Sequence, residues 1–301
     1  MEKFSFKNSL AIACLVLIWG VSWSINKMAL PYTPPLLFAG LRTLLGGAIL
    51  AILFLPSWKL IKWRDNWFRY CVSALFNVVL FFGLQTVGLN YLPGGLFSVL
   101  VYFQPVLIGL FAWMWLGEKM TILKVVGLVL GFLGIVAISA DGFTGEISIV
   151  GVCLALLCAI GWALGVIYVK KQSNKVDPLW MIALQLLIGG SFLLSLGTGL
   201  ESWSNIVWSG PYFIGLGFGA TLGIPIAFII YFKLVNSGDA SKVASFTFLV
   251  PLIAVLIGSI FMNEPITLSL LGGLILIVSS ICFVNYRGKV KEQQLKKENV
   301  S

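Results

Sequence analysis

Long uninterrupted apolar runs, separated by short polar segments, dominate the chain from residue 9 to residue 286. An α-helix needs about 20 apolar residues to cross a bilayer, and most of these runs have that length. Strands of a membrane barrel would instead alternate between apolar and polar residues over about 10 positions. Because lipid offers no hydrogen-bond partners to the backbone, the runs predict helices.

The pattern predicts ten spans joined by short connections, and hence an all-α membrane protein with ten transmembrane helices. In chain order the predicted spans are 9–30, 36–55, 69–89, 94–116, 121–140, 147–169, 179–200, 210–232, 243–262 and 267–286. The longest connection is Pro56–Phe68, which leaves no room for a soluble domain. Composition agrees, because 10% of the residues are charged, against about 25% in soluble domains.

The positive charges indicate the orientation of the chain in the membrane. With a cytoplasmic N-terminus, 18 of the 20 Lys and Arg residues fall on the inside, and the remaining two, Lys27 and Arg42, lie within spans. Loops of membrane proteins follow this bias, so we expect a multi-pass protein of the cytoplasmic membrane with both termini cytoplasmic. The net charge of +9 therefore reflects topology and not nucleic-acid binding.

The chain also repeats itself. With a shift of 143 residues or, beyond the second span, 146 residues, the matched pairs are Trp19 and Trp162, Lys27 and Lys170, Arg42 and Gln185, Pro105 and Pro251, and Glu118 and Glu264. Coincident Trp, Pro and Glu residues in one consistent order indicate a duplication.

Each repeat holds five spans, an odd number, so the second repeat must enter the membrane from the opposite side. The charges agree, because Glu118 is followed by Lys119 and Lys124 on the expected inside, whereas its counterpart Glu264 is followed by Pro265. We therefore expect a first five-helix repeat in residues 1–140, an inverted repeat in 147–286 and a basic cytoplasmic tail in 287–301. Secondary transporters built this way bind substrate at mid-membrane between the halves.

At these residues the chain resembles the drug/metabolite transporter superfamily, specifically its EamA-type ten-span branch. The resembling residues are Trp19-Gly20, Arg42 and residues 88–118, which read GLNYLPGGLFSVLVYFQPVLIGLFAWMWLGE. The spacing from Pro105 to Gly117-Glu118 is typical of such proteins, although the second copy has Asn263 where the family usually has Gly. The resemblance covers residues 9–286 and implies export or import of amino acids, other metabolites or drugs.

The side chains that carry most chemistry are missing from mid-membrane. All 11 acids lie in loops, tails or helix ends, and the chain has no His. An intramembrane proton relay has no obvious member here. Nucleophile–base pairs and ligand clusters are also lacking, so we expect no enzyme, no metal and no cofactor.

Polar or amphipathic side chains at estimated mid-depth are the candidate substrate-binding residues. They are Trp19, Trp23, Asn77, Tyr102, Gln104 and Trp162. Anchoring at the bilayer surface explains many Trp residues but not Trp19 and Trp162, for which pocket lining and core packing are equally good interpretations. Polar groups on aromatic walls suit a neutral, zwitterionic or aromatic solute.

Two mid-span prolines, Pro105 and Pro251, complete this set. A helical Pro lacks a donor and crowds the carbonyl four residues back, here that of Val101 or Thr247. We expect a pair of kinks lining a wet cavity, and ordinary packed kinks are the alternative.

Arg42 lies about six residues, or ~9 Å, inside the outer end of its predicted helix. Such a charge needs a partner. We expect an ion pair with Glu264 that closes an outer gate, and a weaker inner contact between Gln185 and Glu118 that mirrors it. The alternative is that Arg42 binds a substrate carboxylate.

Taken together, the residues and the resemblance predict a secondary transporter that moves a small organic metabolite, an amino acid or related solute or a drug, by alternating access. Export is the expected direction, and the expected partners are the substrate and membrane lipids, with no particular oligomeric state indicated. The alternative is a membrane-embedded enzyme or flippase acting on a lipid-linked substrate. A lateral groove open to lipid would favour the flippase.

The predicted topology can be tested by cysteine labelling on a Cys-free background. Lys62→Cys and Lys175→Cys should react with an impermeant maleimide only from the cytoplasmic side, because both positions fall on the positively charged side of the membrane. Labelling of either position from outside would contradict the ten-span topology.

Overall fold

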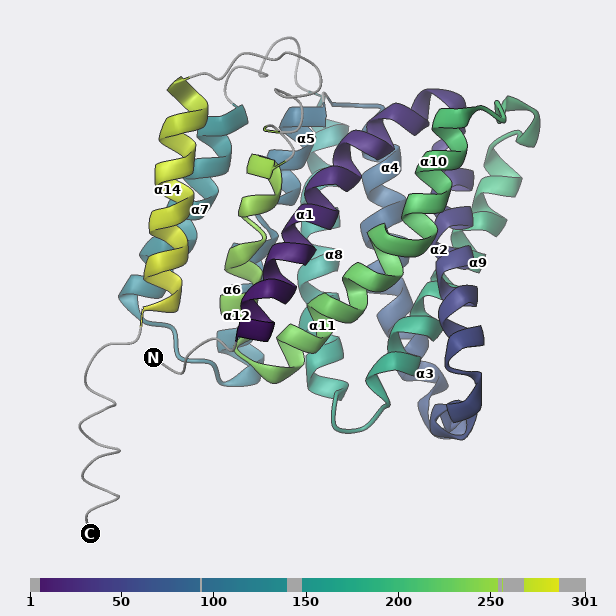
Figure 1. Ribbon diagram of the computed structural model, residues 1–301, viewed down its shortest axis with the longest axis horizontal. Coiled ribbons are helices and arrows are strands. Elements are labelled where there is room, and N and C mark those ends of the chain that lie inside the picture. Colours follow the sequence, from purple (N-terminus) through teal and green to yellow (C-terminus); the bar gives the residue numbers. More distant parts are fainter. Residues whose placement is uncertain (1–5, 93, 140–147, 254–255, 257–267, 287–301) are drawn as a thin grey trace.

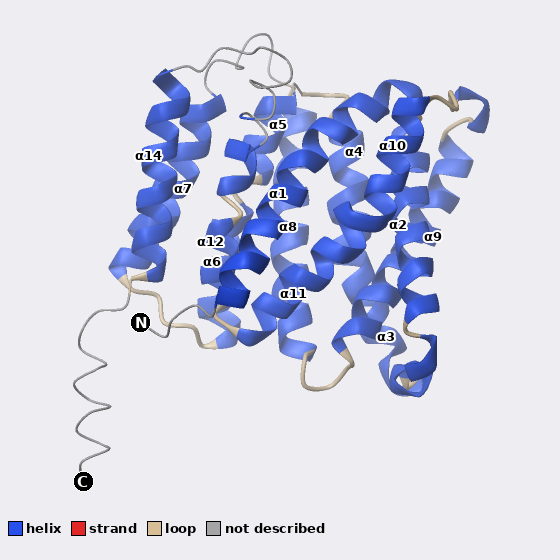
Figure 2. Ribbon diagram, in the orientation of Figure 1, coloured by secondary structure: helices blue, strands red, loops and turns tan. Residues whose placement is uncertain are grey.

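The structure is a computed structural model that describes residues 6–92, 94–139, 148–253, 256 and 268–286. These residues form a bundle of helices that run mostly side by side (Figures 1 and 2). In chain order the helices are α1 (Phe6–Ala29), α2 (Pro35–Leu53), α3 (Trp63–Ala74), α4 (Leu84–Gly88), α5 (Gly94–Val101), α6 (Gln104–Leu116), α7 (Ile122–Ser139), α8 (Ile149–Gln172), α9 (Pro178–Leu200), α10 (Gly210–Phe218), α11 (Ala227–Ser237), α12 (Ala240–Phe246) and α14 (Leu268–Asn285).

Within the described residues, 7 helical segments are long and apolar enough to cross a membrane, and three shorter apolar helices accompany them. The long segments are Lys7–Tyr32, Pro35–Leu53, Trp63–Gly88, Phe97–Leu116, Ile149–Gln172, Pro178–Leu200 and Gly210–Ser237, and the shorter ones are Ile122–Ala137, Ala240–Ile253 and Leu271–Asn285. Each segment overlaps one predicted span. The chain is therefore an all-helical membrane protein.

The largest departure from the predicted spans lies in the segment Pro56–Phe68, which was expected to be a loop. A 3₁₀ turn covers Leu55–Ile61, and α3 already begins at Trp63. Asp65 stands in the first turn of α3, where a negative charge favours the helix N-terminus. The apolar pattern starts this helix too late because its first turn is polar.

The two ends of the bundle face opposite sides. Helix α1 begins and α14 ends on the same side, which we call the terminal face, and the opposite side is the far face (Figure 1). Large apolar side chains cover the outside of the bundle, including Ile52, Ile122 and Ile275, which are 71%, 83% and 67% exposed. Lipid tails are the solvent that such a surface requires.

Helices α2 and α9 pack closely and in opposite directions. A Cβ atom added to any of the glycines involved would collide with the backbone of the facing helix. Such an atom on Gly40 would lie 2.6 Å from the amide nitrogen of Leu194. One on Gly190 would lie 2.5 Å from that of Leu44, and one on Gly47 would lie 2.7 Å from that of Leu187. The residue numbers rise along α2 while they fall along α9. Small residues thus allow two backbones to touch in lipid, where packing drives helix association.

The same arrangement recurs between α7 and α14, which lie side by side at one end of the bundle (Figure 1). The closest approaches join Gly127 to Val284, Gly131 to Ser280 and Gly134 to Ile277. The numbers again rise along one helix and fall along the other. The three glycines of α7 therefore serve helix packing, and α7 and α14 are antiparallel as well.

Two spans contain a π-helical segment. Leu75–Gly83 connects α3 to α4, and Gly219–Ile226 connects α10 to α11. Pro225 lies inside the second segment, where the missing N–H disturbs the regular hydrogen-bond ladder. π-helical turns of this kind are frequent at functional sites, and the two segments stand at matching places in the two halves of the chain.

Two substitutions on α9 test the contribution of the α2–α9 contact. Gly190→Ala should lower the free energy of unfolding by roughly 1–3 kcal/mol, because overpacking forces the facing backbone of Leu44 to shift. Gly199→Ala is the control, since nothing lies within 4 Å of a Cβ atom there. The control should be neutral or slightly stabilising, because Ala favours helix over Gly. Equal thermal stability of the two purified variants would contradict the close packing.

Candidate functional site

The centre of the bundle holds a cluster of aromatic rings. We define the aromatic cluster as Trp19, Phe81, Trp162, Phe228, Tyr231 and Phe232. Trp162 is 1% exposed, and its ring centroid lies 5.8 Å from Trp19, 4.5 Å from Phe81 and 5.4 Å from Tyr231. Rings at such distances attract each other beyond the area that they bury. The cluster joins helices α1, α8 and α11 and the π-helical segment Leu75–Gly83.

Trp19 and Trp162, which contact each other, are equivalent residues of the two halves of the chain. These residues occupy equivalent positions under the 143-residue shift, and their rings meet edge to face at an interplanar angle of 76°. Two equivalent residues can touch each other only near the axis that relates the two halves. The two tryptophans that were expected at mid-depth therefore lie at the junction of the halves.

Two polar atoms of the cluster lie close to each other but form no hydrogen bond of good geometry with any described residue. They are Trp162 Nε1 and the hydroxyl of Tyr231, and both are buried. An unsatisfied buried polar group costs free energy, so such groups are rare in native proteins. Tyr231 was not expected from the sequence, because it is one of many aromatic residues in an apolar run.

A second aromatic pair lies beside the cluster, on α1 and at the end of α5. Trp23 Nε1 donates a hydrogen bond to the Tyr102 hydroxyl at 3.1 Å, and the two rings are 6.3 Å apart. Gln104 follows at the start of α6, buried, with Oε1 unpaired among the described residues. The structure thus brings Trp23 and Tyr102 together in direct contact.

The span that contains Pro105 is interrupted just before the proline, at the place where a kink was expected. Helix α5 ends at Val101 and α6 begins at Gln104, which places Pro105 in the first turn of α6. The first turn tolerates Pro, because its amide has no intrahelical partner anyway. The span containing Pro251 is interrupted at a similar place, since α12 ends at Phe246.

The predicted contact between Gln185 and Glu118 is also wrong, because each has other partners. Gln185 Oε1 accepts hydrogen bonds from Ser73 Oγ and from Asn77 Nδ2, the latter at 3.0 Å. All three side chains are fully buried where α3 and the following π-helical segment meet α9. Asn77, a predicted substrate-binding residue, therefore belongs to a packed polar contact between two helices.

Arg42 is buried on α2 with 3% exposure. Its Nη1 donates a hydrogen bond to Asn26 Oδ1 at 2.7 Å, and its guanidinium carbon lies 5.2 Å from the Phe38 ring and 5.1 Å from the Phe82 ring. Glu264, its predicted partner, lies outside the described residues.

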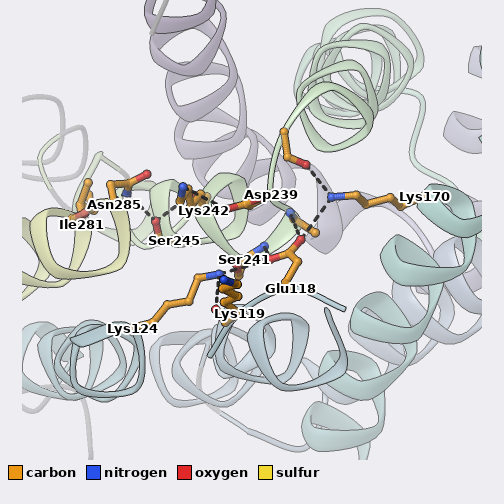
Figure 3. A network of polar contacts seen from close by, with 12 residues as sticks. Glu118, Lys119, Lys124, Lys170, Asp239, Ser241, Lys242, Ser245, Ile281 and Asn285 are labelled. Atoms are coloured by element: carbon orange, nitrogen blue, oxygen red, sulfur yellow. Dashed lines mark hydrogen bonds and ion pairs between the residues drawn. The ribbon is translucent and has the colours of Figure 1, made fainter. Parts of the chain in front are cut away.

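Glu118 forms a network at the terminal face (Figure 3). Its Oε1 accepts a hydrogen bond from the amide of Ala240 at 2.6 Å and lies 3.2 Å from Lys170 Nζ. Its Oε2 accepts a hydrogen bond from Ser241 Oγ at 2.5 Å and lies 3.4 Å from Lys124 Nζ. We call Glu118, Lys124, Lys170, Ala240 and Ser241 the Glu118 latch, because it ties the end of α6 to α7, to the end of α8 and to the start of α12.

Local structure presents Glu118 to these partners. Gly117 ends α6 with a φ of 69°, a left-handed conformation that glycine adopts without strain. The turn carries Glu118 to the start of α12, where free backbone amides and the positive end of the helix dipole favour a carboxylate. The sequence singled out Glu118 but not Lys170 or Ser241, which the chain brings in from 52 and 123 residues away.

The latch keeps its carboxylate ionised. Burial alone raises the pKa of Glu118, but the Ser241 hydrogen bond and the charges of Lys170 and Lys124 outweigh it and lower the pKa below its usual range. Because the folded-state pKa is lowered, the stabilisation by the latch is present at neutral pH. It is lost only as the pH falls through that lowered pKa.

A groove of about 520 Å³ opens on the outside of the bundle between α1 and the helical segment Ala240–Ile253. Its walls include Ile12, Val16, Phe246 and Ile253, with Ser9 as the polar contribution. The groove is apolar and therefore offers little to a polar solute.

Glu118→Gln tests the latch. The amide cannot compensate the charges of Lys124 and Lys170, so the free energy of unfolding should fall by roughly 1.5–3 kcal/mol, the contribution of hydrogen bonds to charged groups. Hydrogen exchange at the first turn of α12 should accelerate accordingly. Glu201→Gln is the control, because the Glu201 carboxylate likewise accepts two backbone amides, those of Leu36 and Leu37, but at the start of α2. It should leave exchange at α12 unchanged. Similar hydrogen exchange at the first turn of α12 in both variants would show that Glu118 does not hold α12 in place.

Comparison with known proteins adds family membership to this geometry. The EamA-like transporter family matches residues 7–140 and again residues 149–286. A Bacillus subtilis protein described as "Uncharacterized transporter YvbV" is 54% identical over 286 residues, covering 95% of this chain and 94% of its own. An Escherichia coli protein described as "Uncharacterized inner membrane transporter YedA" is 29% identical over 83% of this chain and 81% of its own.

A solved crystal structure shares the fold, with a TM-score of 0.79 at 19% identity over 93% of this chain and 96% of that chain. The two family matches together cover nearly all of the chain, and they fall on either side of the segment between α7 and α8. The chain belongs to the EamA-like transporter family and is a multi-pass membrane transporter, not an enzyme.

Proposed function

We propose that the chain is a ten-span secondary transporter that moves a small organic metabolite by alternating access between two inverted five-helix halves, residues 1–140 and 147–286, followed by a cytoplasmic tail. The antiparallel packing of α2 on α9 and of α7 on α14 supports the inversion, because each pair joins equivalent spans of the two halves. The contacts are also reciprocal: Gly47 meets Leu187 while Gly190 meets Leu44, as a two-fold relation requires.

One observation carries the location of the substrate site. Trp19 and Trp162 are equivalent residues in mutual contact, so the aromatic cluster lies where the halves meet. In transporters with inverted repeats the site lies near mid-membrane at this junction. Rocking of the halves would part these rings and admit the solute between them.

The chemistry of the cluster suggests the kind of solute. Its rings are packed together, and when the halves part, Trp162 Nε1 and the Tyr231 hydroxyl can each form a hydrogen bond with a solute that enters between them. Pockets of this composition bind solutes that carry an apolar body and a few polar groups. An amino acid, a related metabolite or a drug of that shape is the proposed substrate, and export is the proposed direction.

The Glu118 latch is the proposed inner gate. It brings three segments with Lys residues together at the terminal face, which the charge distribution assigns to the cytoplasm. Residues of both halves contribute to it, so the halves cannot separate on that side while it is formed. The described arrangement is accordingly a state in which the inner side is closed.

A flippase acting on a lipid-linked substrate is the second candidate, because the groove between α1 and the segment Ala240–Ile253 opens toward lipid. Its walls are almost entirely apolar, whereas the headgroup of a flipped lipid needs a polar path. Transport of soluble solutes, with no movement of lipid-linked ones in the same proteoliposomes, would decide between the two functions.

The proposed site is tested by removing single hydroxyl or indole groups. Tyr231→Phe and Trp162→Phe should slow solute efflux from proteoliposomes by about tenfold each, since one hydrogen bond contributes about 1 kcal/mol and a solute-facing group somewhat more. Tyr212→Phe is a matched control, because its hydroxyl is also buried without a described partner but lies in another hydrophobic cluster. It should transport like the wild type.

Tyr231→Phe and Tyr212→Phe should fold normally, because removing a buried hydroxyl without a partner is nearly neutral for stability. Trp162→Phe removes part of a buried ring and leaves a cavity, so its thermal unfolding is measured before its transport rate is compared. Wild-type transport rates in both Tyr231→Phe and Trp162→Phe would show that substrate does not bind at the aromatic cluster.

A further inference from the structure

Arg42 is the least compensated charge that the structure describes inside the bundle. A guanidinium group has five N–H donors and stays charged in proteins. Asn26 accepts one of them, while Nε is buried without a partner among the described residues. The ion pairs in the described part of the chain lie at the terminal face and do not include Arg42. A buried charge in this condition is costly, so its retention points to a role.

The repeat shows that the scaffold does not require a charge at this position. Gln185 is the equivalent residue in the second half, where its Oε1 accepts hydrogen bonds from Ser73 and Asn77 and its Nε2 has no partner among the described residues. A neutral amide thus fills the same place on α9 that Arg42 fills on α2. The positive charge therefore serves a function that is specific to the first half of the chain.

Arg42 is connected to the aromatic cluster by a row of rings. Its guanidinium carbon lies 5.1 Å from the Phe82 ring, and Phe82 stacks on Phe228 at 5.8 Å with an interplanar angle of 18°. Phe228 in turn lies 5.4 Å from Trp162. A solute with its apolar body on these rings can therefore reach the guanidinium group with a polar end.

The geometry around the guanidinium group suits a planar anion. The rings of Phe38 and Phe82 hold the group by cation–π contacts, and the hydrogen bond to Asn26 fixes Nη1. Gly219 faces the aliphatic part of Arg42, with a Cβ position 3.1 Å from Cδ, so a side chain there would crowd the arginine. Nε is buried and has no partner among the described residues, and the guanidinium edge that contains it can bind a carboxylate through two parallel hydrogen bonds once the bundle opens to admit one.

We propose that Arg42 binds the carboxylate of the transported solute, with Asn26 as its positioning residue. The inference rests on the proposed transport function and narrows the substrate class to organic acids and zwitterions that carry an aromatic or aliphatic body. The carboxylate lies at Arg42 and the body lies on the rings from Phe82 to Trp162.

Binding to the purified full-length protein tests the assignment. The probes are phenylalanine, leucine and phenylacetate, each compared with its own carboxamide, which keeps the body and removes the negative charge. The readout is the rise in unfolding temperature with ligand concentration, from which an apparent Kd follows. The wild type should bind the acids more tightly than the amides.

Three variants separate binding from folding. Arg42→Gln, which copies the residue at the equivalent position, should weaken acid binding by roughly 10- to 100-fold and leave amide binding unchanged, because a charged hydrogen-bonded contact is lost. Arg42→Lys keeps the charge without the planar edge and should retain part of the preference for acids. Lys27→Gln is the control for a cation, since Lys27 is exposed on α1, and it should behave like the wild type.

Three results would overturn the assignment. The first is a wild-type protein that none of the three acids stabilises more than its amide, and the second is an Arg42→Gln variant that keeps the preference. The third is recovery of acid binding when Glu264→Gln is added to Arg42→Gln, which would make Arg42 one half of an ion pair. In each case proteoliposomes that still move neutral solutes would leave the transport function standing.

Discussion

Close antiparallel packing of equivalent helices is the constraint on which the rest of the structure depends. Lipid provides no hydrophobic drive for helix association, so backbones must approach until small residues touch. Gly40, Gly47 and Gly190 permit this between α2 and α9, and Gly127 and its neighbours permit it between α7 and α14. Trp19 and Trp162, which are equivalent under the 143-residue shift, also contact each other.

The structure combines a tight scaffold with contacts that can break. Glycines bring backbone against backbone between α2 and α9, and backbone against side chains between α7 and α14. The Glu118 latch is different, because its carboxylate and its lysines lie at the terminal face. Water can take the place of either partner there when the contact breaks. Hydrogen bonds to charged groups contribute about 1.5–3 kcal/mol, an energy that substrate binding at the aromatic cluster can match. A gate of this strength can open without unfolding the bundle.

Much of the fold follows from the sequence, because lipid enforces a simple rule on the backbone. The apolar runs predict the spans, and the matched Trp, Pro and Glu residues predict the duplication. Helix interruptions are less accessible: the break before Pro105 and the π-helical segment Leu75–Gly83 depend on neighbours that the local pattern does not contain. The first turn of α3 was missed because polar residues there look like a loop.

The residues of the candidate site were easier to predict from the sequence than the contacts between them. Trp19 and Trp162 were identified by their depth, and Glu118 by its place in the repeat. The repeat gives equivalent positions in the two halves but not which helices face each other, so the partner of Glu118 was misassigned to Gln185. Lys170 and Ser241 reach Glu118 only through the tertiary fold, and only the fold places Phe82 between Arg42 and the cluster.

Distances between spin labels report directly on whether the terminal face and the far face open and close in alternation. One label pair replaces Lys119 and Lys242 across the latch at the terminal face, and a second pair replaces Tyr91 and Trp203 at the far face. During transport in proteoliposomes, the account predicts that the distance across the latch lengthens in the same population in which the far-face distance shortens. Transport with both distances unchanged, or with both lengthening together, would contradict alternating access around the aromatic cluster.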